Sequence, residues 1–259
     1  PLHLAFDETA KAANARGIRA TGSELVGLVP KSAMLEAGKY FLRKQNRSTG
    51  IHESELIKIA IKSMGLDELG PFIPEERIIE YMLESEDEKK LVDLSLTDFA
   101  NETASESPAP GGGSISAYAG VLGISLATMV ANLSAHKRGW DERWEKFSDW
   151  ADQGQILKDE LLFLVDEDTN SFNKIMEAMR LPKGSDAEKK ARKEAMDAAT
   201  KYAILTPFHV MQASLKSMEI IEQMAKIGNP NSVTDAGVGA LCARTAVIGA
   251  FLNVKINCK

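Results

Sequence analysis

Five long helical patterns fill almost all of the chain after residue 90, and they constrain the fold more than any other feature of the sequence. In each pattern apolar residues recur three or four positions apart, as on one face of an α-helix, and Pro or Gly punctuates the region. No stretch of this region alternates polar and apolar residues as a strand does. The sequence therefore predicts an all-α helical bundle with helices over residues 95–105, 114–136, 141–180, 185–227 and 232–257.

Two of these helices begin with capping signals. Ser185 with Glu188, and Ser232 with Asp235, have the Ser-x-x-acid spacing of a capping box. Gly228-Asn229-Pro230 is a strong stop between the last two helices. We expect these boundaries to be the best defined in the chain.

Residues 1–82 differ from the rest because helical spacing alternates there with a short apolar run. That run, Glu24–Val29, is ended by Pro30 and has the length of a buried strand. We expect this region to be the C-terminal part of an α/β domain, with too few strands to form a sheet of its own.

A run of charged residues, Glu84–Lys90, cannot be buried and predicts an interdomain linker over 83–90. The second domain is then expected over 91–259. Because the chain opens on Pro1 without Met or a secretion leader, we expect it to be part of a longer protein.

The composition excludes several classes of partner. The 31 Lys and Arg against 37 Asp and Glu give a net charge of -6, the wrong sign for attracting nucleic acid or anionic lipid. Cys242 and Cys258 form no C-x-x-C motif, and the four histidines are scattered, so neither a disulfide framework nor a zinc site is predicted. We expect no bound metal and a location in the reducing cytoplasm.

The glycine-rich segment Ser107–Ser114 leads directly into a predicted helix. Backbone N–H groups and the positive end of the helix dipole make such a position suitable for an anion. The segment lacks the Gly-Lys-Ser/Thr ending of a P-loop, which favours a carboxylate or a single anion over a nucleoside triphosphate. The alternative is a flexible entry loop capped by Ser114.

The helix after this loop carries a stripe of small side chains that would let another backbone approach closely. The stripe comprises Ser116, Gly120, Gly123, Ala127 and Ser134. Residues 115–133 are almost wholly apolar, so a membrane span is an alternative. The polar residues within the run favour a central bundle helix or a dimer helix instead.

Asp168 lies on the apolar face of the third predicted helix, whereas Asp166 lies about 200° away on the polar face. The apolar face comprises Leu157, Leu161, Leu164, Val165, Phe172, Ile175 and Met179. Burial raises the pKa of a carboxyl group, and a raised pKa suits proton transfer near neutral pH. The alternative for Asp168 is a structural acid that bonds a neighbouring helix.

The basic pair Lys137-Arg138 ends the small-residue helix, where cations suit the helix dipole, although the pair could equally hold an acidic substrate. His136 beside it is expected to be a surface or packing residue. Asp235 is expected to be a capping acid, with substrate binding as the alternative.

Taken together, these segments resemble the bifunctional formiminotransferase-cyclodeaminases of histidine and folate metabolism. Upstream, Gly22–Pro30 and Pro71–Tyr81 resemble the end of the formiminotransferase domain. Within 91–259 the matching segments are Ser107-x-Ala109-Pro110-Gly111-Gly112-Gly113-Ser114, Lys137-Arg138, Leu164-Val165-Asp166-x-Asp168-x-x-x-Phe172, Leu181-Pro182-Lys183-Gly184, and Gly228-Asn229 with Ser232-x-x-Asp235.

The chain departs from the family pattern at three places. The transferase active site of the family precedes residue 1, so transferase activity is expected only together with that region. The cyclodeaminase domain of the family usually continues past Asn257, so 91–259 is expected to be truncated. His136 stands where the family has a glycine.

The resemblance implies conversion of 5-formiminotetrahydrofolate to 5,10-methenyltetrahydrofolate and ammonia, with no metal or second cofactor. It assigns the proton transfers to an aspartate of the V-D-x-D segment, and the helical-face argument selects Asp168. It implies a homo-oligomer and a polyglutamylated substrate. The substrate contacts it implies are Gly111, Gly112, Gly113, Ser114, Lys137, Arg138, Asp166, Lys183 and Asp235. A helical module that binds folate without turnover, and a dimerisation scaffold without a ligand, remain the alternatives.

Overall fold

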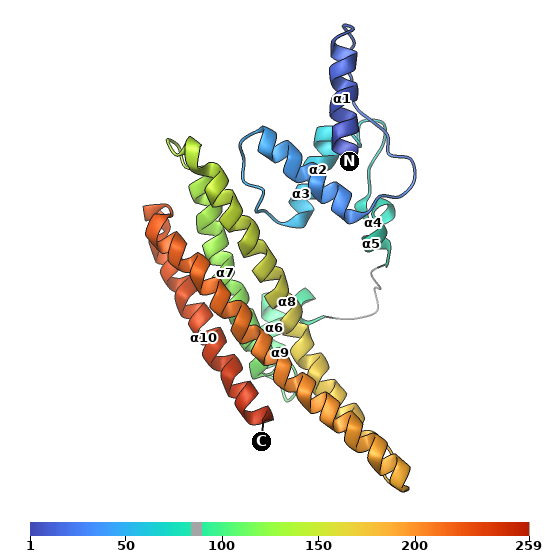
Figure 1. Ribbon diagram of the computed structural model, residues 1–259, viewed down its shortest axis with the longest axis vertical. Coiled ribbons are helices and arrows are strands. Elements are labelled where there is room, and N and C mark those ends of the chain that lie inside the picture. The colour runs from blue at the N-terminus through green and yellow to red at the C-terminus, as the bar shows by residue number, and fades with distance from the viewer. Residues whose placement is uncertain (84–89, 259) are drawn as a thin grey trace. The chain divides into compact units, whose positions relative to one another are not determined.

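The computed structural model describes residues 1–83 and 90–258, so most of the linker expected over 83–90 lies outside the described residues (Figure 1). The chain divides into two compact units. One unit combines Pro1–Glu88 with Asn132–Asp152, and the other combines Lys89–Ala131 with Gln153–Lys259. The α-helices are α1 (Leu2–Asn14), α2 (Lys31–Lys44), α3 (Glu53–Met64), α4 (Pro74–Arg77), α5 (Ile79–Leu83), α6 (Leu96–Thr103), α7 (Gly112–Ala135), α8 (Trp144–Arg180), α9 (Asp186–Ile227) and α10 (Val233–Asn257).

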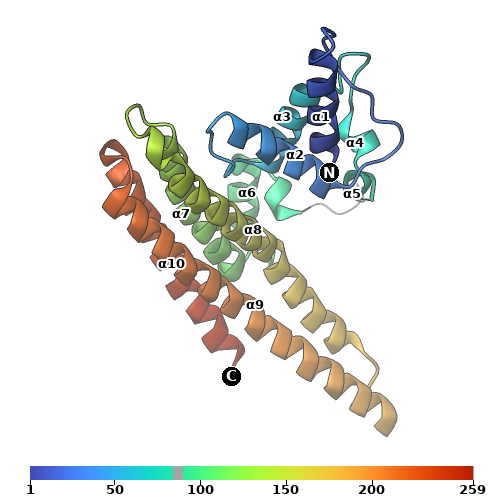
Figure 2. The same cartoon turned by 45° about the horizontal axis from the view of Figure 1, so that its top comes forward.

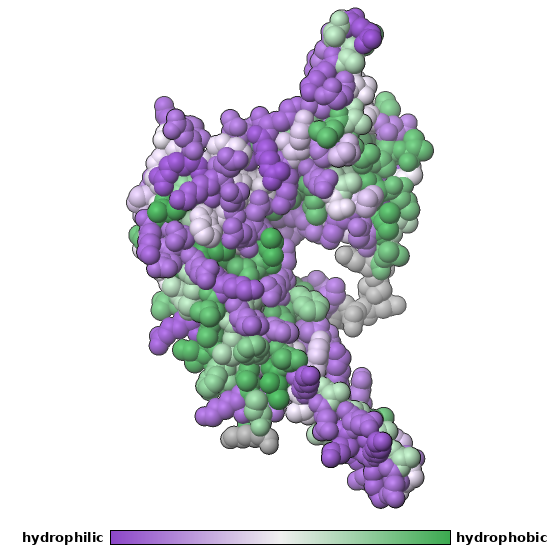
Figure 3. All heavy atoms as spheres, in the orientation of Figure 1, coloured by the Kyte–Doolittle hydropathy of each residue, from purple (hydrophilic) through white to green (hydrophobic). Residues whose placement is uncertain are grey.

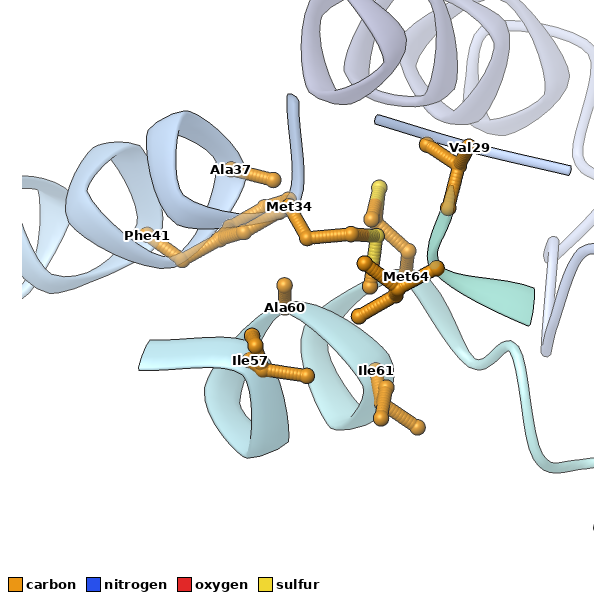
Figure 4. Packing of buried hydrophobic residues seen from close by; sticks show 9 residues of the cluster. Val29, Met34, Ala37, Phe41, Ile57, Ala60, Ile61 and Met64 are labelled. Carbon is orange, nitrogen blue, oxygen red and sulfur yellow. The ribbon is translucent and has the colours of Figure 1, made fainter. Parts of the chain in front are cut away.

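The N-terminal unit is helical, and the expected α/β character of residues 1–82 is wrong. The segment Glu24–Val29 does not form a strand, because only Val29 pairs with another residue, in a single parallel bridge to Ile78. Its core lies between α2 and α3, where Met34, Ala37 and Phe41 belong to the same buried cluster as Ala60 and Ile61 (Figure 4). Within the described residues the unit therefore buries helix faces rather than a sheet.

A polar contact joins the loop after α2 to residues of α7 and α8 within the same unit. Thr49, which is 1% exposed, donates its backbone N–H to Ser148 Oγ at 2.9 Å. Asn132 Nδ2 donates to the carbonyl of Gly50 at 2.8 Å. A Cβ at Gly50 would lie 2.3 Å from that of Ala151, so the close approach requires glycine.

The second unit is built from long helices whose bounds lie within about three residues of the predicted ranges, and Figures 1 and 2 show α7, α8, α9 and α10 side by side. Ser185 forms the predicted capping box with Glu188 at the start of α9. Ser232 makes no capping hydrogen bond through its side chain, so the second predicted capping box, with Asp235, is wrong.

The small residues of α7 are used for packing within the chain. A Cβ at Gly120 would lie 2.8 Å from Ser214 Oγ of α9, and one at Gly123 would lie 2.8 Å from the carbonyl of Gly239 in α10. The stripe thus lets α9 and α10 approach α7 closely, which is the bundle-helix alternative.

The predicted apolar face of α8 is buried only in part. Leu161, Leu164 and Val165 are buried, but Phe172 and Met179 are 41% and 48% exposed. The reason is that α7 begins opposite Asp168, so α7 does not cover the part of α8 that extends beyond this residue.

Two helices, α7 and the stretch Pro230–Asn257 that contains α10, are long and apolar enough to cross a membrane by length and composition. In the most apolar window of each helix, 61% of the residues in α7 and 22% of those in Pro230–Asn257 are buried within the protein. Apolar side chains gather on the surface over the C-terminal part of α10 and the neighbouring part of α9 (Figure 3).

Candidate functional site

The carboxylate of Asp168, from the middle of α8, is bound at the N-terminus of α7. The backbone N–H of Ser114 donates to Asp168 Oδ2 at 2.9 Å. The hydroxyl of Ser114 lies 2.9 Å from the carbonyl of Val165 and 3.2 Å from the same Oδ2. One backbone N–H that was predicted to bind a substrate anion is therefore occupied by a carboxylate of the chain itself.

Gly113 makes this contact possible. A Cβ at this position would lie 2.0 Å from Asp168 Oδ1 and 2.4 Å from its Cγ, much closer than any real contact. The preceding residue, Gly112, has room for a side chain, because a Cβ there would be 3.5 Å from the nearest side-chain atom. The glycine-rich loop thus serves to admit the Asp168 carboxylate.

Burial raises the pKa of Asp168 above its ordinary value, while the two hydrogen bonds from Ser114 oppose that rise. In the part of the chain that the structure describes, Asp168 forms no ion pair. A carboxyl group in such a setting can exist in both protonation states closer to neutral pH than an exposed one. It can therefore accept a proton and return it.

Asp166 is half-buried rather than solvated, contrary to the prediction from the helical face. Its Oδ1 accepts a hydrogen bond from the backbone N–H of Leu91 at 2.6 Å. Burial raises its pKa, and its bonds to the backbone of Leu91 and Val92 lower it. The structure thus separates the two acids, since Asp168 binds the start of α7 and Asp166 holds the short turn Leu91–Asp93.

The basic residues predicted to contact the substrate do not lie beside Asp168 within one chain. Lys137 and Arg138 follow the C-terminal end of α7, whose 24 residues span about 36 Å from the end that binds Asp168. Lys183 follows Arg180, which lies about 18 Å further along α8 than Asp168. Any contact of these cations with a substrate held at Asp168 must therefore be to a distant part of it.

Asp235 also lies away from Asp168. It is in the first turn of α10, which runs antiparallel to α7, because Gly239 approaches Gly123 whereas Asn253 approaches Gly112. Of the predicted site residues, the structure brings together Gly112, Gly113, Ser114 and Asp168 at one end of α7, with Gly111 immediately before it.

The side chains near Lys137 have partners of their own. The Nζ of Lys137 lies 4.1 Å from the centroid of the Trp140 ring, a cation–π contact. His136 Nε2 accepts a hydrogen bond from the backbone N–H of Ser48 at 3.1 Å. Burial of the ring and the charge of Arg47 lower the pKa of His136. His136 therefore secures the loop after α2.

Two groups near Asp168 could not be identified from the sequence. Glu167 accepts a hydrogen bond from the hydroxyl of Tyr202 on α9, which raises the pKa of Tyr202 to about 12. Asn253 on α10 faces Gly112. The only sequence signal for Asn253 is a polar amide within an otherwise largely apolar helix.

No cluster of three or more His, Cys, Asp or Glu suited to a metal occurs among residues 1–83 and 90–258.

Comparison with known proteins matches the chain to two protein families. Residues 95–259 match the family described as formiminotransferase-cyclodeaminase, and residues 1–84 match the formiminotransferase domain. The chain is 36% identical to formimidoyltransferase-cyclodeaminase of Gallus gallus over all of this chain and 48% of that protein. It is 34% identical to the protein of the same name from Dictyostelium discoideum, over 99% of this chain and 47% of that protein. The chain thus spans about half the length of these relatives.

Two further proteins resemble the helical region. Methenyltetrahydrofolate cyclohydrolase of Methylorubrum extorquens is 32% identical, over 64% of this chain and 79% of that protein. The crystal structure of formiminotetrahydrofolate cyclodeaminase from Thermotoga maritima has a TM-score of 0.57 and 26% identity. It covers 65% of this chain and 80% of that structure.

Proposed function

The chain belongs to the formiminotransferase-cyclodeaminase family, and on that premise we propose that it converts 5-formiminotetrahydrofolate to 5,10-methenyltetrahydrofolate and ammonia. The observation that carries the proposal is the half-buried Asp168 carboxylate at the start of α7, with a raised pKa and Oδ2 bound by Ser114. The catalytic group in this proposal is Asp168.

The reaction requires one proton to move between two nitrogen atoms of the substrate. N10 attacks the formimino carbon and forms a C–N bond, and N10 then loses its proton. The amino group on the same carbon gains a proton and leaves as ammonia, which leaves the methenyl bridge between N5 and N10. The formimino group reacts in its protonated, amidinium form, and Asp168 takes the proton from N10 and returns it to the departing amine. No proton is then gained or lost overall, and the positive charge of the amidinium ends on the methenyl bridge.

The environment of Asp168 suits both halves of this transfer. Ser114 holds Oδ2, while Oδ1 accepts no hydrogen bond from any residue in the described ranges. Oδ1 is therefore the oxygen that is available to the substrate. A pKa above that of an exposed aspartate makes the protonated form accessible without a strong acid.

The remaining contacts belong to the proposal as well. The folate substrate carries glutamate carboxylates, often several, and Lys183, beyond the end of α8, offers a cation for such a tail. Lys137 and Arg138 follow the opposite end of α7, so they are not assigned to the same tail. We place the enzyme in the cytoplasm, where Cys242 and Cys258 would stay reduced.

Asp166 is assigned to the Leu91–Asp93 turn rather than to the substrate, because its Oδ1 accepts the hydrogen bond from the backbone N–H of Leu91.

A homo-oligomer is part of the proposal, on the basis of the outward face of α10. Leu241, Phe251, Leu252 and Ile256 on this helix are between 48% and 63% exposed. Exposed apolar side chains on one helix are typical of a surface that another subunit covers. Light scattering of the chain at micromolar concentration tests this, and a monomer would contradict it.

A second candidate activity is hydrolysis of the methenyl bridge, because the relative from Methylorubrum extorquens bears the name of a cyclohydrolase. In that reaction water, instead of N10, would attack the bridging carbon. The same acid could accept the proton of the water molecule. The two activities start from different compounds and are therefore easy to separate.

The proposal is tested by incubating the chain with 5-formiminotetrahydrofolate while methenyl absorbance and ammonia are followed. Equal formation of both products supports cyclodeamination. A parallel incubation with 5,10-methenyltetrahydrofolate reveals hydrolysis as a loss of absorbance. Binding of folate without either reaction would favour a non-catalytic module, and neither binding nor turnover would favour a scaffold.

A further inference from the structure

The last two turns of α10 have their polar and apolar residues in the reverse of the usual arrangement. Asn253 and Asn257 are partly buried, whereas Phe251, Leu252 and Ile256 are 48%, 60% and 60% exposed. Burying an amide costs free energy unless its hydrogen bonds are made. The partners of these two amides therefore show what each asparagine does.

The partner of Asn257 is within the protein. Its Nδ2 donates to the carbonyl of Ala203 on α9 at 2.8 Å, which ties the two helices together. Asn253 makes no such tie. Its Nδ2 donates to Gly249 of its own helix at 3.0 Å, and its Oδ1 accepts no hydrogen bond from the residues that the structure describes.

Asn253 lies against the same turn of α7 that binds Asp168. A Cβ at Gly112 would be 3.5 Å from Asn253 Nδ2 and 3.7 Å from its Oδ1, and a Cβ at the next residue, Gly113, would be 2.0 Å from Asp168 Oδ1. Successive residues of a helix project about 100° apart, so the amide and the carboxylate lie on two sides of one helical turn, on the order of 10 Å apart.

The position of Asn253 is fixed by the packing one turn earlier. A Cβ at Gly249 would lie 2.3 Å from Ser116 Oγ, so α10 and α7 are in close contact there. Ser116 Oγ in turn donates to the carbonyl of Gly112 at 2.6 Å. The backbone that carries Asn253 is therefore held against the first turn of α7.

We propose that Asn253 is a substrate-positioning residue of the Asp168 site, whose Oδ1 accepts a hydrogen bond from an N–H group of the substrate. The inference rests on the proposed function and adds a third helix to the site. A neutral amide suits the task, because it can bind an amidine or amine N–H without adding a second negative charge near Asp168.

The first test compares Asn253→Ala with Asn257→Ala in the full chain. Loss of a substrate hydrogen bond should lower kcat/KM for 5-formiminotetrahydrofolate by about 10-fold to 100-fold in Asn253→Ala. Asn257→Ala should keep kcat/KM within about 3-fold and lower the melting temperature, because it removes a tie between helices. Unchanged kcat/KM in a folded Asn253→Ala variant, with active wild type, would overturn the inference.

A second test needs no turnover. In Asn253→Asp a new carboxylate on the order of 10 Å from Asp168 should raise the pKa of Asp168 by about one pH unit, as followed by NMR of its side-chain carboxyl carbon. Thr245→Asp, at an exposed position about 12 Å back along α10 from Asn253, should raise it less. Equal shifts in the two variants would contradict the placement of Asn253.

The two tests separate this inference from the proposed function. If the wild-type chain does not turn over 5-formiminotetrahydrofolate, the proposed function fails, and the positioning role fails with it. The pKa comparison would still decide whether Asn253 shares a site with Asp168. If the wild type is active and only the Asn253 predictions fail, the proposed function stands.

Discussion

Ser114 and Asp168 meet through a single oxygen: the backbone N–H and the hydroxyl of Ser114 both point to Asp168 Oδ2, at 2.9 and 3.2 Å. The two residues are 54 positions apart and belong to different helices. Their contact fixes one oxygen of the carboxylate at the positive end of α7 and leaves Oδ1 without such a bond. The serine thus orients the acid and also tunes its pKa.

Replacement of Ser114 should change the pH dependence of the reaction. Both hydrogen bonds from Ser114 lower the pKa of Asp168, and Ser114→Ala removes the one from the hydroxyl. The pKa should therefore rise further, and the acidic limb of the kcat/KM profile should move to higher pH. Ser171→Ala is a suitable control, because Ser171 donates to the backbone carbonyl of Asp168 and not to its carboxylate. A shift to lower pH in Ser114→Ala would contradict this relationship.

Gly113 should tolerate no side chain. In Gly113→Ala the new Cβ would overlap with Asp168 Oδ1, so the carboxylate must move, and we expect kcat to fall at least 10-fold. The control is Gly237→Ala in α10, where a Cβ meets nothing within 4 Å. That variant should keep full activity and gain about 0.5–1 kcal/mol in unfolding free energy. A fully active Gly113→Ala enzyme would show that the close contact is not needed.

The sequence predicted the helices of the second unit well, because each is long and has a regular apolar period. It failed for Glu24–Val29, since an apolar run of six residues fits a strand but cannot reveal whether other strands pair with it. The helical face placed Asp168 on the side of α8 that meets α7, but it misjudged Asp166, which is half-buried, and Phe172 and Met179, which are exposed. Periodicity does not show where a neighbouring helix begins.

The candidate site was predictable only as separate motifs. The glycine loop and Asp168 were each singled out, but no sequence pattern indicates that the carboxylate itself occupies the helix N-terminus. Asn253 was missed because isolated amides in an apolar helix are not a motif, and the role proposed for it rests on the packing of α10 on α7.

Lowering the pH should weaken the N-terminal unit through His136. Because the pKa of His136 is lowered in the folded state, the neutral ring is favoured there, and its contribution to stability is complete above the unfolded pKa of about 6.5. The contribution should be lost as the pH falls from there through the folded pKa. His3 titrates in the same direction, so the comparison must be between wild type and His136→Gln.

The measurement is the melting temperature of both proteins from pH 8 to pH 5. The wild type should lose more stability than His136→Gln over this range, because Ser48 N–H can no longer donate to a protonated ring. Parallel curves would show that His136 does not secure the loop.

Lys183 should matter for affinity and not for the chemical step. Since it lies beyond the end of α8, far from Asp168, its contact with a substrate tail would stabilise the ground state and the transition state equally. Lys183→Ala should therefore raise KM several-fold with kcat nearly unchanged. The exposed Lys190 on α9, changed to Ala, provides the control. A large fall in kcat with KM intact would place Lys183 at the reacting atoms.

The central claim is that Asp168 moves the proton, and paired amide substitutions test it most directly. Asp168→Asn and Asp166→Asn make the same chemical change two residues apart, one at the start of α7 and one at the Leu91–Asp93 turn. Measurement of kcat for 5-formiminotetrahydrofolate should show a loss of about 10²-fold to 10⁴-fold in Asp168→Asn and little loss in Asp166→Asn, with both proteins folded by their melting temperatures. Retained turnover in Asp168→Asn together with lost turnover in Asp166→Asn would contradict the assignment.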